Sequence, residues 1–144
     1  SASSADEPNN STGNTKRASN LLLPPDSSGL FRGGELQDHN FAESSFTKDD
    51  VGTSVTECDL TNVDTSNVET MEKMFYRASS FNQDIGNWDT SNVETMSFMF
   101  SGASSFDQDI SAWCVEQITQ KPSNFDQEAG FEGGNKRPNW GDTC

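Results

Sequence analysis

The sequence predicts an α/β solenoid, a short stack of coils in which each 25-residue repeat contributes one helix and one short strand. Two observations predict it: a block of sequence recurs at a fixed offset, and apolar residues within each copy follow helical spacing. The positions of two cysteines predict a disulfide-closed C-terminal cap, and a Ser/Asn-rich beginning predicts an extended N-terminal arm.

The repeat is the clearest signal in the chain. Residues 64–71 and 89–96 both read DTSNVETM, and the register continues through the rest of each copy. A partial copy precedes them at 59–63, and a decayed copy follows, in which Phe125 aligns with Phe100. One repeat cannot bury enough apolar surface to fold alone, so neighbouring copies have to stack and share a core.

Each copy also carries a helix-start signal. Ser66-x-x-Glu69 and Ser91-x-x-Glu94 have the form of a capping box, which predicts a helix beginning there. The apolar residues that follow have the spacing of one inward helical face: Val68, Met71, Met74 and Phe75 in the first copy, and Val93, Met96, Met99 and Phe100 in the second. Residues 84–88 are interpreted as a strand.

Composition divides the chain into four parts. These are a low-complexity extended arm at 1–28, an N-terminal cap region at 29–57, the repeat solenoid at 58–113, and a degenerate repeat with the C-terminal cap at 114–144. The arm contains two overlapping Asn-x-Ser/Thr sequons, at Asn9 and Asn10, which make it a candidate glycan carrier.

Charge excludes several classes of partner. The chain has 23 acidic and 9 basic residues, and its formal net charge of −14 repels nucleic acid and anionic lipid. The longest apolar run, Leu21-Leu22-Leu23, is far shorter than the roughly 18 to 20 residues that cross a bilayer, so we expect no membrane insertion. The chain begins at Ser1 without a leader, which fits a mature secreted protein.

Cysteine usage favours the same extracellular compartment. Cys114 and Cys144 bracket a Gly/Asn/Pro-rich segment with little apolar content, and we pair them. Cys58 is left over. It is interpreted either as a small buried hydrophobe or as a thiol available for an intermolecular bond.

At residues 88–100, WDTSNVETMSFMF, and at 81–85, FNQDI, the chain resembles the repeats of BspA-type leucine-rich-repeat bacterial surface proteins. The ending from Trp113 to Cys144 resembles the terminal cap of such arrays, which supports the cysteine pairing. The resemblance implies right-handed, leucine-rich-repeat-like coils, a secreted or cell-surface location, and roles in attachment, aggregation or binding of surface partners. It implies no catalytic chemistry. Family arrays usually contain many more coils than this chain.

Four aspartates are weak candidates for a calcium site. Asp64 and Asp89, and likewise Asp84 and Asp109, should stack on adjacent coils about 5 Å apart, where a cation would relieve their repulsion. Alternatively, each carboxylate accepts backbone N–H groups in a turn. We expect no other cofactor. The single histidine, His39, lies outside the repeats without a catalytic or zinc-ligand pattern, so we expect no enzyme.

Two functions remain open. The first is an extracellular structural protein that self-assembles into a fibre or surface layer, with arm residues Leu21, Leu22 and Leu23 adding to the edge of the next copy. The alternative is a monomeric cell-surface adhesion or ligand-binding module for a glycan or a host protein. The sequence leans slightly to the first function, and the family resemblance leans to the second.

Overall fold

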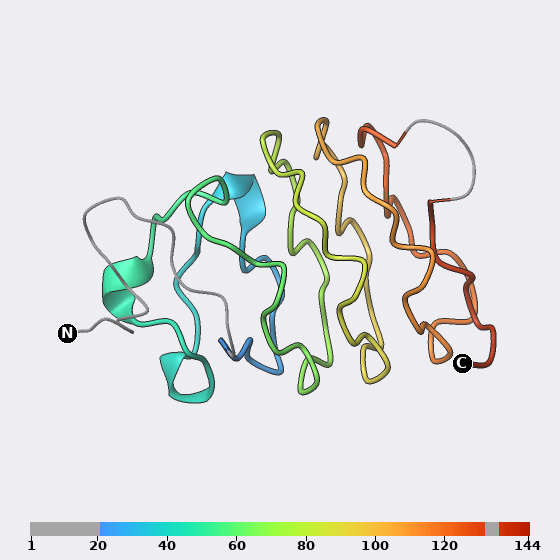
Figure 1. The fold of residues 1–144 in the computed structure, drawn as a ribbon, viewed down its shortest axis with the longest axis horizontal. Helices are drawn as coiled ribbons and strands as arrows, with labels where there is room; N and C mark the ends of the chain where they lie inside the picture. The colour runs from blue at the N-terminus through green and yellow to red at the C-terminus, as the bar shows by residue number, and fades with distance from the viewer. Residues whose placement is uncertain (1–20, 132–135) are drawn as a thin grey trace.

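The chain forms an elongated row of coils that lie side by side (Figure 1). The computed structural model describes residues 21–131 and 136–144. Within these ranges, the helices are three 3₁₀-helices that all precede the repeats: η1 (Arg32–Gly34), η2 (Phe41–Glu43) and η3 (Lys48–Asp50). Pairing of the β type is limited there to isolated bridges, such as the parallel bridge between Thr70 and Thr95.

The predicted α/β solenoid is therefore wrong. The described part of the chain contains no α-helix and no sheet, so the right-handed, leucine-rich-repeat-like coil of one helix and one strand is absent. The capping boxes do not cap helices. Ser66 Oγ donates to Asp64 Oδ1 at 2.6 Å, and the backbone N–H of Glu69 donates to the carbonyl of Pro25 at 2.8 Å.

Backbone conformation explains why helices do not form. Lys73 and Arg77 have φ angles of 59° and 60°, in the left-handed region, and Phe98 and Gly102 repeat the pattern with 61° and 79°. A left-handed residue at every fourth position interrupts the right-handed helical backbone. Alternate peptide groups then point toward the neighbouring coil, as the hydrogen bonds between coils show.

These peptide groups form hydrogen-bonded columns that cross four ladder segments, which we define as residues 29–33, 72–77, 97–102 and 123–128. In the central column, the N–H groups of Phe31, Phe75 and Phe100 each donate to a carbonyl of the next segment at 2.8–2.9 Å. Similar columns begin at Gly29 and Gly33. In all three columns the donor belongs to the earlier segment and the acceptor to the later one.

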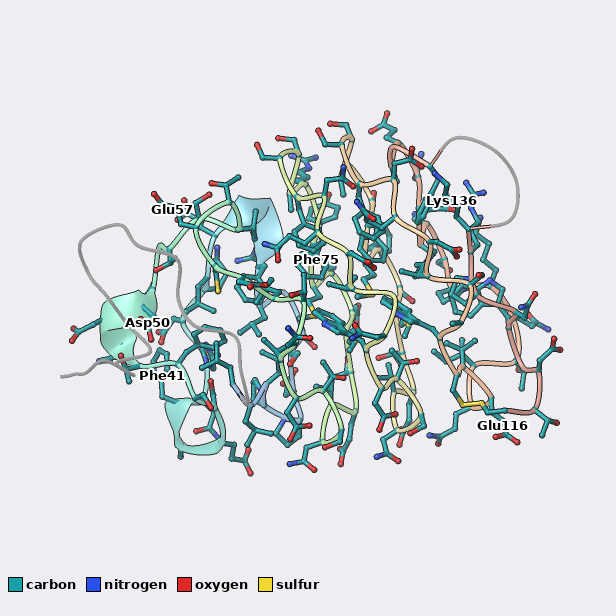
Figure 2. The ribbon with its side chains drawn as sticks, in the orientation of Figure 1. Phe41, Asp50, Glu57, Phe75, Glu116 and Lys136 are labelled. Atoms are coloured by element: carbon teal, nitrogen blue, oxygen red, sulfur yellow. A yellow bond between two sulfur atoms is a disulfide. The ribbon has the colours of Figure 1, made fainter. Side chains whose placement is uncertain are left out.

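Aromatic side chains stack with the same period as the backbone. The ring of Phe75, labelled in Figure 2, lies 5.7 Å from that of Phe31 and 5.6 Å from that of Phe100 and is nearly parallel to both. Trp88 and Trp113 are stacked with their ring centroids 6.2 Å apart.

The predicted inward face is confirmed, because all eight apolar residues assigned to it have 0% exposure. A succession of turns, rather than a helix, produces the spacing of three between these residues. The N–H groups of Met74 and Ala78, for example, donate to the carbonyls of Met71 and Phe75, three residues earlier.

The N-terminal end of the row is covered by the chain itself. Residues 35–57 bury Leu36, Phe46 and Val55 against the first coil, and Phe46 meets Phe31 edge-on with ring centroids 6.0 Å apart. The side of the row that would otherwise expose Phe31 is thus closed by apolar residues that do not belong to the repeat.

The C-terminal end is closed by a disulfide, as predicted. Cys114 and Cys144 are bonded with their Cα atoms 5.6 Å apart, in the normal range. The decayed copy, however, is shifted by one residue from the sequence alignment. The N–H of Ala129 donates to Asp126 O as the N–H of Ala103 donates to Phe100 O, so Asp126 occupies the position of Phe100.

Candidate binding surface

Outward-facing polar side chains form rows across the coils. Asn92 Nδ2 donates to the carbonyl of Ser66 in the preceding coil at 2.8 Å, and Gln117 Nε2 donates to the carbonyl of Ser91 at 2.7 Å. This row borders an open groove that crosses four coils. Its lining residues are Pro25, Ser66, Asn67, Glu69, Asn92, Glu94 and Gln117. The groove therefore offers amide and carboxylate groups rather than apolar surface.

The four candidate calcium aspartates make contacts of the turn-capping kind. Asp64 Oδ1 accepts the N–H of Ser66 at 2.9 Å as well as its hydroxyl, and Asp89 and Asp109 make the same pair of contacts with the serine two residues later. Asp84 accepts the N–H of Gly86 at 3.1 Å. The hydrogen bonds from the serine hydroxyl, followed by those from its backbone, lower the pKa of Asp64 and of Asp109. We therefore propose no calcium site.

One cluster of metal-ligand residue types occurs among the described residues: Cys114, Glu116 and Cys144. Glu116 lies beside the disulfide (Figure 2). The two sulfur atoms are bonded to each other, so they are not the thiolates that bind metals.

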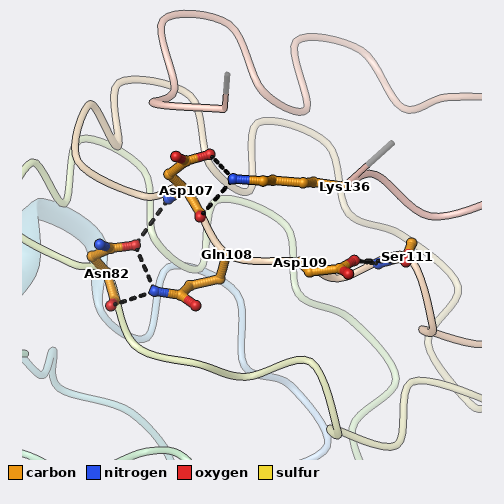
Figure 3. Close-up of polar contacts among 6 residues, drawn as sticks. All are labelled: Asn82, Asp107, Gln108, Asp109, Ser111 and Lys136. Atoms are coloured by element: carbon orange, nitrogen blue, oxygen red, sulfur yellow. Dashed lines mark hydrogen bonds and ion pairs between the residues drawn. The ribbon is translucent and has the colours of Figure 1, made fainter. Parts of the chain in front are cut away.

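A second polar row ties the C-terminal segment to the repeats (Figure 3). Asn82 Oδ1 accepts the N–H of Asp107 at 2.9 Å and Gln108 Nε2 at 3.0 Å. Lys136 Nζ forms an ion pair with Asp107 Oδ1 at 2.8 Å. These side chains link two repeats to the segment after residue 135.

Asp126 is the most enclosed ion-paired carboxylate of the C-terminal segment. Its side chain is 9% exposed, Lys121 Nζ lies 2.9 Å from Oδ1, and Arg137 Nε donates to Oδ2. Burial raises the pKa of Asp126, but hydrogen bonds from Arg137 and Lys121 outweigh it and hold the pKa below its ordinary value. Asp126 therefore joins the last coil to the terminal segment.

The other predicted site residues lie in the interior or outside the described ranges. Leu21 and Leu23 are 5% and 0% exposed within their own chain, and Leu22 forms a parallel bridge with Asp64. Cys58 is 2% exposed in the same core, which fits its interpretation as a small buried hydrophobe. The sequons at Asn9 and Asn10 lie outside the described residues.

A group of cationic and aromatic residues on the second and third ladder segments was not predicted from the sequence. Lys73 Nζ lies 5.7 Å from the ring centre of Phe98, and Arg77 Cζ lies 5.2 Å from that of Tyr76. The available signal was variation between the copies. Lys73, Tyr76 and Arg77 are replaced by Phe98, Ser101 and Gly102, while the buried apolar positions are identical.

Comparison with known proteins placed the repeats in a family. A family model described as "Mycoplasma protein of unknown function, DUF285" matches residues 42–141. The chain belongs to the DUF285 family. The match includes both full repeats of this DUF285 chain and fits the expected class of bacterial surface-repeat proteins. Neither the curated proteins nor the solved structures gave a match. None of the helices in the described residues is long and apolar enough to cross a membrane.

Proposed function

We propose that this DUF285 chain is a non-catalytic extracellular binding module of a bacterial surface, as the resemblance of its repeats to BspA-type proteins implies. The observation that carries the proposal is that the chain's own segments cover the apolar core at both ends of the row. Phe125, in the last coil, is 0% exposed and meets Trp140 edge-on at 4.9 Å. The only strongly exposed large apolar side chain among the described residues is Val51.

Closed ends leave the polar sides of the row for a partner. The groove beside Glu69 and Glu94 presents amides and carboxylates at positions that the repeat fixes. Such preorganised polar surfaces bind without paying a large ordering entropy. The disulfide supports an extracellular location, because disulfides persist in oxidising compartments.

The test is a binding screen of the full chain against glycan arrays and immobilised host matrix proteins. The matched variant is Glu69→Gln with Glu94→Gln, which removes the groove charges and leaves the side-chain shape. We expect saturable binding by the wild-type chain and weaker binding by the variant if the groove is used. A chain that is folded by near-UV circular dichroism but binds nothing would contradict the proposed function.

Self-assembly is the second candidate, and one observation favours it. The N–H groups of Asn124, Asp126 and Glu128 continue the three columns but have no acceptor among the described residues. This open ladder edge could receive an extended segment of another copy, as in strand addition. Leu21 and Leu23 are buried in the core of their own chain, so in this form of the hypothesis the arm does not supply the segment that adds to the next copy. Sedimentation over a hundredfold range of concentration and negative-stain microscopy test it: filaments support assembly, and a constant monomer argues against it.

A further inference from the structure

We propose that Lys73, Tyr76, Arg77 and Phe98, here called the cation–aromatic patch, bind a carboxylated sugar. The proposal rests on the binding function proposed above and names a surface and a ligand class for it. The patch is separate from the Glu69 groove, and none of its residues lines that groove.

The patch is a continuous chain of contacts across two coils. Lys73 lies over Phe98, Phe98 meets Tyr76 edge-on with centroids 6.2 Å apart, and Arg77 lies over Tyr76. Both cations are exposed and both rings are partly exposed. Neither cation forms an ion pair with a carboxylate of the described chain, in contrast to Lys121, Lys136 and Arg137. In a protein with a net charge of −14, these two cations are left available.

The backbone holds the patch in place. The N–H groups of Lys73 and Arg77 donate to Ser97 O at 2.9 Å and Ser101 O at 2.7 Å. A Cβ atom at Gly102 would lie 3.2 Å from both Cα and Cγ of Arg77, so the glycine makes room for the arginine side chain against the next coil. The backbone that carries the patch is therefore already ordered before a ligand binds.

The chemistry of the patch selects an isolated carboxylate on a sugar. A guanidinium group binds a carboxylate through two parallel hydrogen bonds, and aromatic rings pack against the apolar face of a sugar ring. The acidic surface of the rest of the protein repels densely charged polymers such as polysulfated chains. A mostly neutral glycan that ends in a uronic or sialic acid has both the charge and the apolar face that the patch fits.

The experiment is calorimetry of the full chain with three probes: a glucuronate-terminated oligosaccharide, its glucose-terminated counterpart, and a short oligoglutamate peptide. We expect binding of the first probe only. Arg77→Gln should weaken it about tenfold, the loss expected for one charge-assisted contact. Tyr76→Ser, which installs the residue of the next copy, should also weaken it. Lys48→Gln removes one exposed positive charge on η3 and should change the affinity less than about twofold.

Each other outcome overturns the proposal. Equal binding of the neutral sugar removes the role of the cations, and equal binding of oligoglutamate makes the patch an acidic-peptide site. If the Arg77→Gln variant binds the glucuronate probe as the wild type does while the double variant Glu69→Gln with Glu94→Gln does not, the cation–aromatic patch is not the binding site, and the proposed binding function stands. If the folded chain binds no probe here and nothing in the wider screen, both proposals fail.

Discussion

At position 126 an aspartate stands where the earlier coils have a buried phenylalanine. Phe31, Phe75 and Phe100 stack on one another, and a further phenylalanine would continue that stack. Asp126 instead binds Lys121 and Arg137 and draws the terminal segment across the last coil. The substitution of a charge for a ring thus ends the repeat at the level of one residue.

Asp126→Asn tests this role through its pH dependence. The pKa of Asp126 is lowered in the fold, so its carboxylate stabilises the protein above the unfolded pKa of about 3.9, and the contribution disappears as the pH falls through the lower folded pKa. We expect the variant to lose about 1 to 3 kcal/mol at pH 7 and to approach wild type in strong acid. Urea unfolding at several pH values measures this, with Asp142→Asn as the exposed control. A pH-independent difference would contradict it.

Gly86 is a second residue-scale constraint. A Cβ atom at this position would lie 2.6 Å from the carbonyl oxygen of Asp109 in the next coil. Gly86→Ala should therefore push the two coils apart and destabilise the fold by about 1 to 3 kcal/mol. Thermal unfolding of Gly86→Ala and of the exposed neighbour control Asn87→Ala checks the prediction; equal melting temperatures would show that the coils can move apart at no cost.

At the scale of elements, sequence patterns located the inward side chains but not the backbone path. The spacing of Val68, Met71 and Met74 correctly identified buried positions. The same spacing of three fits a succession of turns as well as a helix. Left-handed backbone conformations at Lys73, Arg77 and Phe98 exclude the helix. Lysine, arginine and phenylalanine rarely adopt this conformation, so their presence does not predict it as a glycine or an asparagine would.

The same limit applied to the last coil and to the candidate sites. The last coil contains one extra residue, so Asp126 occupies the structural position that the sequence alignment assigned to Phe125. An alignment of the copies without gaps does not show this shift. Pairing of Cys114 with Cys144 was predictable, because those cysteines flank a segment with little core of its own. The cation–aromatic patch was not found, since two of its three contacts join residues on different copies.

The disulfide gives an element-scale prediction. It closes a sequence separation of 30 residues, so the chain-entropy model assigns it about 3 to 4 kcal/mol. Cys144→Ser should lower the denaturation midpoint accordingly. Reductant should bring the wild-type midpoint to that of the variant and leave the variant unchanged, because the thiol of Cys58 is buried. A wild-type midpoint that reductant does not move would contradict a stabilising role.

At the scale of the whole molecule, one core extends from Leu21 in the first coil to Phe125 in the last. The first coil comes from the end of the predicted arm and the beginning of the predicted N-terminal cap. These residues replace a missing repeat: the N–H groups of Ser27 in the arm and Gly29 in the cap region donate to carbonyls of the next coil at 3.1 and 2.8 Å. The row therefore has four coils in its ladder, although only two copies are complete in sequence.

Deletion of residues 1–28 tests this assignment. The deletion removes the buried side chains of Leu21 and Leu23, at about 2 kcal/mol each, and exposes one side of the next coil. We expect a fall in stability of about 3 to 5 kcal/mol, measured by urea unfolding. Deletion of residues 1–20 is the control, because it removes none of the described contacts. Equal stability of the two truncated chains would mean that the first coil does not hold the core.

The one-way order of the three hydrogen-bonded columns has an electrical consequence. Each peptide group in a column accepts from the preceding segment and donates to the following one, so the peptide dipoles add along the row as they do along an α-helix. The positive pole lies at the N–H groups of Asn124, Asp126 and Glu128. Asp126 is neutralised there by Lys121 and Arg137, whereas Glu128 has no ion pair among the described residues and places negative charge at the pole that attracts it.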